Sequence, residues 1–106
     1  MTRFQNKIAI VTGGCRGIGK AIVERFLNEG AIVYALDYVI PTENETFIEN
    51  TELSKNVIIK QLDVTNFEQV QSVMNDIISE TKRIDFLINN AGITRDNLLM
   101  RMSEND

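Results

Sequence analysis

The residues whose types and spacing could bind a ligand most directly form a glycine-rich turn near the N-terminus. Four glycines fall within the segment Thr12–Gly19, which follows the apolar run Ile8–Val11 and opens a helical pattern. The first N–H groups of a helix have no helical partner, and the helix dipole favours a negative charge beside them. Glycine lets the backbone bend sharply and approach a ligand closely. The turn therefore predicts a phosphate-binding site, the alternative being an ordinary strand-to-helix turn.

Two kinds of phosphate-binding motif compete for this segment. The run Gly14–Lys20 has the spacing of a P-loop, but Ala21 stands where a hydroxyl would be needed to hold Mg²⁺. An alanine cannot ligate a metal, which argues against nucleoside triphosphate hydrolysis. The dinucleotide-binding template G-x-G-x-x-G is not matched literally either, because the segment has the pattern T-G-x-x-x-G-x-G, with Gly13, Gly17 and Gly19.

A carboxylate after the next predicted strand helps to identify the ligand. Ala31–Leu36 is a continuous apolar run typical of a buried parallel strand, and Asp37 follows it. The distance from the turn is close to the interval of about 20 residues at which a strand-end acid meets an adenosine ribose. Because a carboxylate accepts from both ribose hydroxyls and repels a 2′-phosphate, Asp37 favours NAD(H), with NADP(H) as the alternative. A solvated strand-end charge and a Walker B aspartate are the other interpretations.

The amino-acid composition argues against several classes of protein. The chain has 106 residues, which is enough for one domain, and a net charge of −4 without a cluster of basic residues, which argues against nucleic acid or an anionic membrane as partner. Cys15 is the only cysteine and histidine is absent, so we expect no disulfide framework and no metal cluster. No apolar stretch approaches about 18 residues, and the first strand begins too early for a signal peptide. We expect a cytoplasmic protein.

Hydrophobic patterning predicts the elements that hold the turn and the carboxylate. An apolar stripe at helical spacing runs from the turn to Leu27, and Gly30 is placed as its C-cap. Residues 38–56 are predicted as a loop with one short helix around residues 45–51, because Pro41 breaks any helix begun earlier.

The second half continues the alternation of strands and helices. Val57–Leu62 is predicted as the third strand, and Thr65 and Glu68 have the spacing of a capping box, with Thr65 as N-cap. An amphipathic helix follows as far as Thr81, and Phe86–Ile88 is the fourth strand. The order indicates an α/β fold with a Rossmann-like, doubly wound parallel sheet.

Three segments together resemble the short-chain dehydrogenase/reductase family: Thr12–Gly19, the pair Asp63 and Val64, and Asn89–Gly92. The run Ile93–Met102 is similar in particular to the 3-oxoacyl-[acyl-carrier-protein] reductases of that family, the ketoreductases of bacterial-type fatty acid synthesis. NAD-dependent sugar and alcohol dehydrogenases share much of the rest. The resemblance implies reversible hydride transfer between a nicotinamide and a carbonyl or alcohol, a 3-oxoacyl thioester on a carrier protein as substrate, and a homo-oligomer.

The resemblance also assigns roles to individual residues. The pyrophosphate and adenosine side is lined by Gly13, Cys15, Arg16, Gly17, Ile18 and Gly19. Asp63 and Val64 flank the adenine, with the Asp63 carboxylate near its amino group, although a cap preceding the next helix is an alternative for Asp63. Asn90, Ala91 and Gly92 run beside the ribose on the nicotinamide side, and Asn89 ties neighbouring strands together.

Two features depart from the family pattern. Carrier-protein reductases of the family usually use NADPH, whereas Asp37 favours NAD(H); Arg16 could pair with a 2′-phosphate, but we expect charge repulsion by Asp37 to outweigh that contact. The catalytic Ser, Tyr and Lys of the family are also absent, since neither Tyr34 nor Tyr38 has a lysine four residues later.

The C-terminal residues offer an explanation for the missing catalytic group. Ser103–Asp106 has the pattern of a helix N-cap followed by an acidic first turn. We therefore expect residues 1–106 to be the N-terminal, cofactor-binding half of a longer reductase, with an incomplete sheet and no catalytic residues of its own. A non-catalytic dinucleotide-binding module that is complete as given is the alternative.

Overall fold

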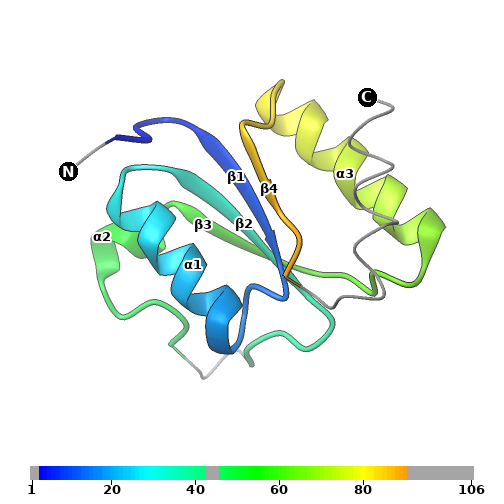
Figure 1. The fold of residues 1–106 in the computed structure, drawn as a ribbon, viewed down its shortest axis with the longest axis horizontal. Coiled ribbons are helices and arrows are strands. Elements are labelled where there is room, and N and C mark those ends of the chain that lie inside the picture. Colours follow the sequence, from blue (N-terminus) through cyan, green and yellow to red (C-terminus); the bar gives the residue numbers. More distant parts are fainter. Residues whose placement is uncertain (1–2, 43–45, 91–106) are drawn as a thin grey trace.

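A four-stranded parallel sheet organises the chain in the computed structural model, which describes residues 3–42 and 46–90. Its strands are β1 (Ile8–Thr12), β2 (Ile32–Asp37), β3 (Val57–Gln61) and β4 (Phe86–Ile88), in the order β3-β2-β1-β4. All neighbouring pairs run parallel. The predicted α/β, Rossmann-like sheet is confirmed, and the strands lie where the apolar runs placed them (Figure 1).

The strand order fixes where a ligand site can form. From β1 the chain moves outward to β2 and β3, and then returns to the other side of β1 to form β4. In register, Thr12 pairs with Leu36 and Asp37 with Gln61, so the carboxyl ends of the strands share one edge. In open parallel sheets the crevice outside this edge, where the strand order reverses, is the usual ligand site.

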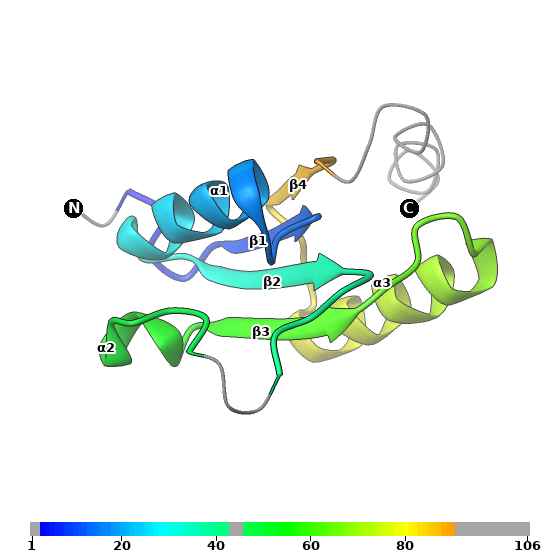
Figure 2. The ribbon, with the colours of Figure 1, turned by 90° about the horizontal axis from the view of Figure 1, so that it is seen from below.

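Helices cover both faces of the sheet, as Figure 2 shows. Helix α1 (Gly17–Asn28) packs on one face and α3 (Phe67–Thr81) on the other. Side chains of β1 alternate between them, with Ala9 and Val11 in the core beneath α1 and Ile8 and Ile10 in the core beneath α3. No helix among residues 3–42 and 46–90 combines the length and apolar character needed to cross a bilayer.

The short helix lies later than predicted. Helix α2 spans Thr51–Ser54 rather than residues around 45–51. Asn50 is its N-cap, because the Asn50 side chain accepts hydrogen bonds from the backbone N of Glu52 at 2.9 Å and of Leu53 at 3.1 Å. The apolar and acidic pattern before Asn50 carried no comparable start signal.

The predicted capping box of α3 is wrong by one residue. Asn66, not Thr65, is the N-cap, and its side chain accepts from the backbone N of Gln69 at 3.1 Å. The Thr65 hydroxyl instead donates to Asp63 Oδ1 at 2.5 Å. Asparagine is a stronger N-cap than threonine, so the helix begins at Phe67.

The C-terminal end of α1 is held by an ion cluster at the edge of the sheet opposite the crevice. Gly30 follows the cap residue Glu29 with φ +93°, a conformation that suits glycine, in line with its predicted capping role. The largely buried Glu29 carboxylate pairs with Arg3 at 3.0 Å and Arg25 at 3.1 Å. Hydrogen bonding by Arg3 is the main reason that the pKa of Glu29 is lowered.

Candidate functional site

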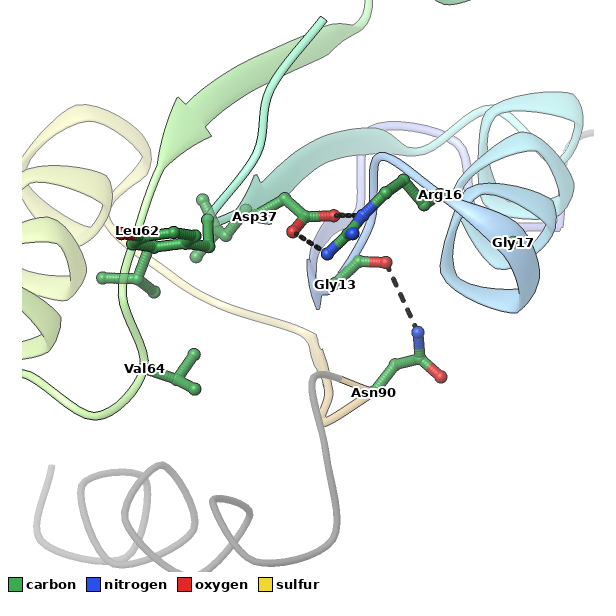
Figure 3. Close-up of a pocket in the computed structure, with 9 residues that line it drawn as sticks. Gly13, Arg16, Gly17, Asp37, Leu62, Val64 and Asn90 are labelled. Atoms are coloured by element: carbon green, nitrogen blue, oxygen red, sulfur yellow. Dashed lines mark hydrogen bonds and ion pairs between the residues drawn. The ribbon is translucent and has the colours of Figure 1, made fainter.

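A cavity of about 250 Å³ opens at the carboxyl edge of the sheet. It lies outside the ends of the strands, beside the start of α1, where the strand order reverses. Its lining is Gly13, Arg16, Gly17, Leu36, Asp37, Tyr38, Leu62, Val64 and Asn90. Figure 3 shows that the labelled residues come from four parts of the chain that the sheet brings together. The position matches the ligand site expected for an open parallel sheet.

The start of α1 is free to receive an anion from this cavity. The backbone N of Lys20 donates to the Arg16 carbonyl at 3.1 Å, so the N–H groups of residues 17–19 precede the first bond of the helix. Arg16 occupies the N-cap position without a side-chain capping bond, and the first turn contains no acidic residue. Gly17 has φ +51°, and a Cβ there would meet nothing within 4 Å. The helix start therefore offers unpaired donors and open space to a phosphate.

Two other glycines allow the turn to pack against the protein itself. A Cβ on Gly14 would lie 2.8 Å from the Val11 carbonyl oxygen. A Cβ on Gly19 would overlap the carbonyl of Gly13 and lie 2.6 Å from Nδ2 of Asn90. Gly14 and Gly19 thus allow neighbouring segments of the chain to pack closely, whereas Gly17 faces open space.

Asp37 closes the cavity at the end of β2, as its strand-end position predicted. Its carboxylate is almost fully buried and forms an ion pair with Arg16, with Nη2 3.0 Å from Oδ1 and Nε 3.5 Å from Oδ2. The backbone N of Cys15 donates to Oδ2 at 3.1 Å, and the backbone N of Val39 donates to Oδ1 at 3.4 Å. The interpretation as a solvated strand-end charge is therefore wrong.

Thr12 links the ends of β1 and β4 beneath the cavity. Its hydroxyl is fully buried, accepts from the backbone N of Asn90 at 2.9 Å and donates to the Ile88 carbonyl at 3.4 Å. The Asn90 side chain in turn donates to the Gly13 carbonyl at 3.4 Å. Sequence reasoning did not single out Thr12, although a hydroxyl that ends a fully apolar strand was a usable signal. The strand-tying role expected of Asn89 stays a prediction.

Replacing Thr12 by valine should destabilise the protein by about 1–3 kcal/mol, because the partly buried backbone N–H of Asn90 would lose its acceptor. The shape of the side chain is nearly unchanged, so packing loss contributes little. Urea unfolding of Thr12→Val and Thr12→Ser, beside the unmodified protein, checks this. The serine variant keeps the hydroxyl and should retain most of the stability. A valine variant as stable as the unmodified protein would contradict the role of the hydroxyl, and a larger loss in serine than in valine would assign the effect to the methyl group instead.

The Asp63 carboxylate serves the local backbone in this structure. Asp63 Oδ1 accepts from the backbone N of Thr65 at 2.9 Å as well as from its hydroxyl, and the Asp63 N donates to Gln69 Oε1 at 2.6 Å. These bonds agree with the alternative of a cap that precedes α3. Val64 lines the cavity, whereas contact between Asp63 and adenine stays a prediction.

The structure gathers six of the predicted site residues around the cavity: Gly13, Arg16, Gly17, Asp37, Val64 and Asn90. Cys15 lies in the core beneath the turn, where burial and then the neighbouring Asp37 raise the pKa of its thiol to about 11. The Ile18 side chain is 75% exposed outside the lining. Ala91, Gly92, the run Ile93–Met102 and the expected helix start Ser103–Asp106 lie outside the described residues.

Sequence reasoning missed three lining residues, Leu36, Tyr38 and Leu62. Leu36 and Tyr38 flank Asp37, and Leu62 precedes Asp63, so each is a chain neighbour of a predicted residue. The signal was available, since every residue at the carboxyl end of a parallel strand is near the crevice. These neighbours are candidates for contact with a flat, apolar part of a ligand.

The position of Lys20 argues against a P-loop, in addition to the missing metal ligand at Ala21. Lys20 Nζ lies 5.3 Å from the centre of the Phe47 ring, and Lys20 does not line the cavity. A P-loop lysine reaches the phosphates from the same turn. Within the described part of the chain, His, Cys, Asp and Glu side chains do not gather into a group that could hold a metal ion.

The sheet is doubly wound and parallel, a helix start with unpaired N–H groups lies at its carboxyl edge, and a buried carboxylate ends the neighbouring strand. These features define the Rossmann-like class of α/β proteins. A model of the short chain dehydrogenase family matches residues 7–106. The chain therefore belongs to this family, as its motifs indicated.

Individual relatives agree with that membership. The chain is 43% identical to 3-oxoacyl-[acyl-carrier-protein] reductase from Salmonella typhimurium over 103 residues, covering 97% of this chain and 41% of the relative. For the Thermotoga maritima reductase the identity is 42% over 106 residues, with 98% and 42% covered. The chain thus spans about two fifths of the length of these curated relatives.

Solved structures give the same fold. Hydroxysteroid dehydrogenase from Escherichia coli has a TM-score of 0.74 at 32% identity, with 87% of this chain and 39% of that one covered. Carveol dehydrogenase from Mycobacterium avium, solved in complex with NAD, has a TM-score of 0.70 at 27% identity, with 88% and 38% covered.

Proposed function

We propose that the chain binds a nicotinamide dinucleotide as the cofactor part of an oxidoreductase that reduces 3-oxoacyl thioesters on an acyl carrier protein. The observation that carries this proposal is the pairing of free N–H groups at the start of α1 with the buried Asp37 in one cavity. A dinucleotide needs both features, an anion site for its pyrophosphate and an acceptor for its ribose. Membership of the family supports the reaction type.

The residues present fit such a cofactor. The uncapped helix start would hold the pyrophosphate, because the space beside Gly17 is open and would admit a phosphate. Leu62 and Val64 give the cavity an apolar wall suited to adenine. When bound, the nicotinamide supplies a hydride; the chain's own residues contribute binding and orientation.

We propose NAD(H) as the preferred cofactor because of Asp37. A carboxylate with little solvent around it repels a 2′-phosphate strongly and accepts hydrogen bonds from ribose hydroxyls. The NAD complex of the related carveol dehydrogenase is consistent with this cofactor. The carrier-protein reductases supply the argument for the substrate, since they are the relatives at 42–43% identity cited above.

A second function rests on the same carboxylate. An NAD-dependent sugar or alcohol dehydrogenase of the family would also place an acid at the end of β2. Aldohexose dehydrogenase from Thermoplasma acidophilum has a TM-score of 0.68 to this chain at 37% identity, with 87% of this chain and 32% of that one covered. Comparing a 3-oxoacyl thioester with an aldohexose as substrate distinguishes the two.

Neither tyrosine of the chain lies where a proton donor for carbonyl reduction is expected. The chain has no histidine and two tyrosines. Tyr34 is buried on the α3 face, where its hydroxyl donates to Glu80 Oε1 at 2.8 Å; burial and this bond raise its pKa to about 12. Tyr38 lines the cavity beside Asp37, which is the end expected to hold the adenosine. Neither can serve as an acid for a nicotinamide near β4.

Residues 1–106 alone should therefore show no reductase activity, because general acid catalysis contributes about 10²–10⁴-fold to such a reaction. The test compares this 106-residue protein with the product of the complete reading frame, following NADH absorbance with a 3-oxoacyl thioester. A Tyr38→Phe variant controls for the one tyrosine in the cavity. Equal turnover by the two proteins would contradict the prediction and would require a donor among these residues.

A calorimetric measurement of NADH binding by the same proteins separates the enzyme from a non-catalytic module. If the complete protein binds NADH but turns over neither a thioester nor a sugar, the binding-module alternative holds. If it binds no dinucleotide at all, the proposed function is wrong.

A further inference from the structure

The hydrogen bonds of Asp37 leave its carboxylate fully engaged before any ligand arrives. A carboxylate offers about four lone-pair positions. The backbone N–H groups of Cys15 and Val39 take one on each oxygen, and the Arg16 guanidinium takes the other two through Nε and Nη2. A ribose with two free hydroxyls needs two acceptor positions, and these are the two that Arg16 holds.

The Asp37 carboxylate is buried behind the Arg16 guanidinium. The Asp37 side chain is 3% exposed, whereas that of Arg16 is 65% exposed. The guanidinium therefore lies between the carboxylate and solvent, and both residues line the cavity, as Figure 3 shows. Cys15 and Val39 contribute fixed backbone donors, but Arg16 is a long side chain in the N-cap position that can swing outward without moving the turn.

We infer that Arg16 is an internal competitor for the ribose position: its ion pair with Asp37 closes this position in the free protein, and NADH binds only when the guanidinium leaves. The inference rests on the proposed dinucleotide site and adds a residue that sets its affinity. Displacement is feasible because the guanidinium itself is mostly exposed, and the backbone N–H groups of Cys15 and Val39 stay on the carboxylate when it leaves. Because NADH must break this ion pair to reach Asp37, the free energy of the pair reduces the affinity for NADH.

This role is opposite to the usual expectation for an arginine beside a phosphate site. A positive charge near the pyrophosphate should strengthen binding, so its removal should weaken binding of NADH. Competition for Asp37 predicts that removal strengthens it. The sign of the change therefore decides between the two roles, independently of its size.

The test measures the Kd of NADH and of NADPH by calorimetry for the product of the complete reading frame and its Arg16→Ala variant. NADH should bind about twofold to fivefold more tightly to the variant, the scale of one ion pair whose arginine is mostly exposed. NADPH should bind no more tightly, because the unpaired Asp37 carboxylate repels the 2′-phosphate more strongly. Arg16→Lys, which keeps the charge but not the two-pronged contact, should be intermediate.

Arg25→Ala is the matched control. Arg25 lies on the same helix, is similarly exposed and pairs with the largely buried Glu29 at 3.1 Å, remote from the cavity. This variant should leave both dissociation constants unchanged, while Arg3 keeps Glu29 paired. Unchanged or weaker NADH binding by Arg16→Ala would overturn the inference while leaving the proposed function intact. Absence of dinucleotide binding by the unmodified protein would instead overturn the proposed function.

Discussion

Replacing Gly19 by alanine should weaken NADH binding by at least about tenfold, the factor for losing one charge-assisted hydrogen bond to a phosphate. The new Cβ would overlap the Gly13 carbonyl and crowd Nδ2 of Asn90, so the start of α1 must move away from the turn. That displacement carries the free N–H groups with it. Overpacking should also lower the free energy of unfolding by about 1–3 kcal/mol. Calorimetric titration and urea unfolding measure the two effects.

Gly30→Ala provides the control for general destabilisation. Gly30 lies at the other end of α1 with φ +93°, and a Cβ there would lie 2.8 Å from Gln5 Oε1. This variant should also lose stability, by about 1–2 kcal/mol from the left-handed backbone conformation, yet bind NADH within about twofold of the unmodified protein. Normal NADH binding by Gly19→Ala would show that the turn does not hold the phosphate.

The Gly19 variant also illustrates what the sequence could and could not predict. The T-G-x-x-x-G-x-G pattern was sufficient to place a strand, a turn and a helix, because each has a local signal. The family resemblance places Gly13 and Gly19 on the pyrophosphate and adenosine side of the site. The structure adds that Gly19 makes room for Gly13, a contact set by how the helix docks on the turn. Such packing between segments has no signature in spacing alone.

The same limit explains the two misplaced helix starts. Capping depends on which side chain reaches the free N–H groups, and neighbouring candidates differ by only about 1 kcal/mol. Thr65 fitted the capping box, but the nearby Asp63 accepts its hydroxyl, which leaves Asn66 to cap α3. Parallel strands, by contrast, were predictable because their apolar runs are continuous and their order follows from right-handed connections.

For Asp37, the position was predictable from the sequence but its ion pair was not. Its place after an apolar run predicted a strand-end carboxylate near the crevice, and the structure confirms this position. The ion pair with Arg16 was not predictable, because residue types and spacing indicate how each side chain could meet a 2′-phosphate but not whether the two side chains contact each other. Their actual geometry makes them partners in the free protein. The relation between these two residues therefore required the three-dimensional structure.

Replacing Asp37 by asparagine should lower the ratio of the Kd of NADPH to that of NADH by about tenfold or more, which corresponds to 1–2 kcal/mol of lost charge repulsion. Asparagine is preferable to alanine or serine here, because its carbonyl oxygen can still accept from the backbone N of Cys15. Alanine would leave that N–H without an acceptor and add a cost of about 1–3 kcal/mol that has nothing to do with the cofactor. Titrations with both cofactors give the ratio.

Asp85→Asn is the matched control for the charge change. Asp85 Oδ2 accepts from a backbone N, that of Ile8 at 2.8 Å, and from an arginine, Arg83 at 3.0 Å, so its contacts mirror those of Asp37 at a site outside the cavity lining. Its replacement should leave the cofactor ratio unchanged. The Asp37 and Arg16 variants should then shift the ratio in opposite directions, since one removes the repulsion and the other exposes it. Tighter binding of NADPH than of NADH by the unmodified protein would contradict the role of Asp37, whatever the variants do.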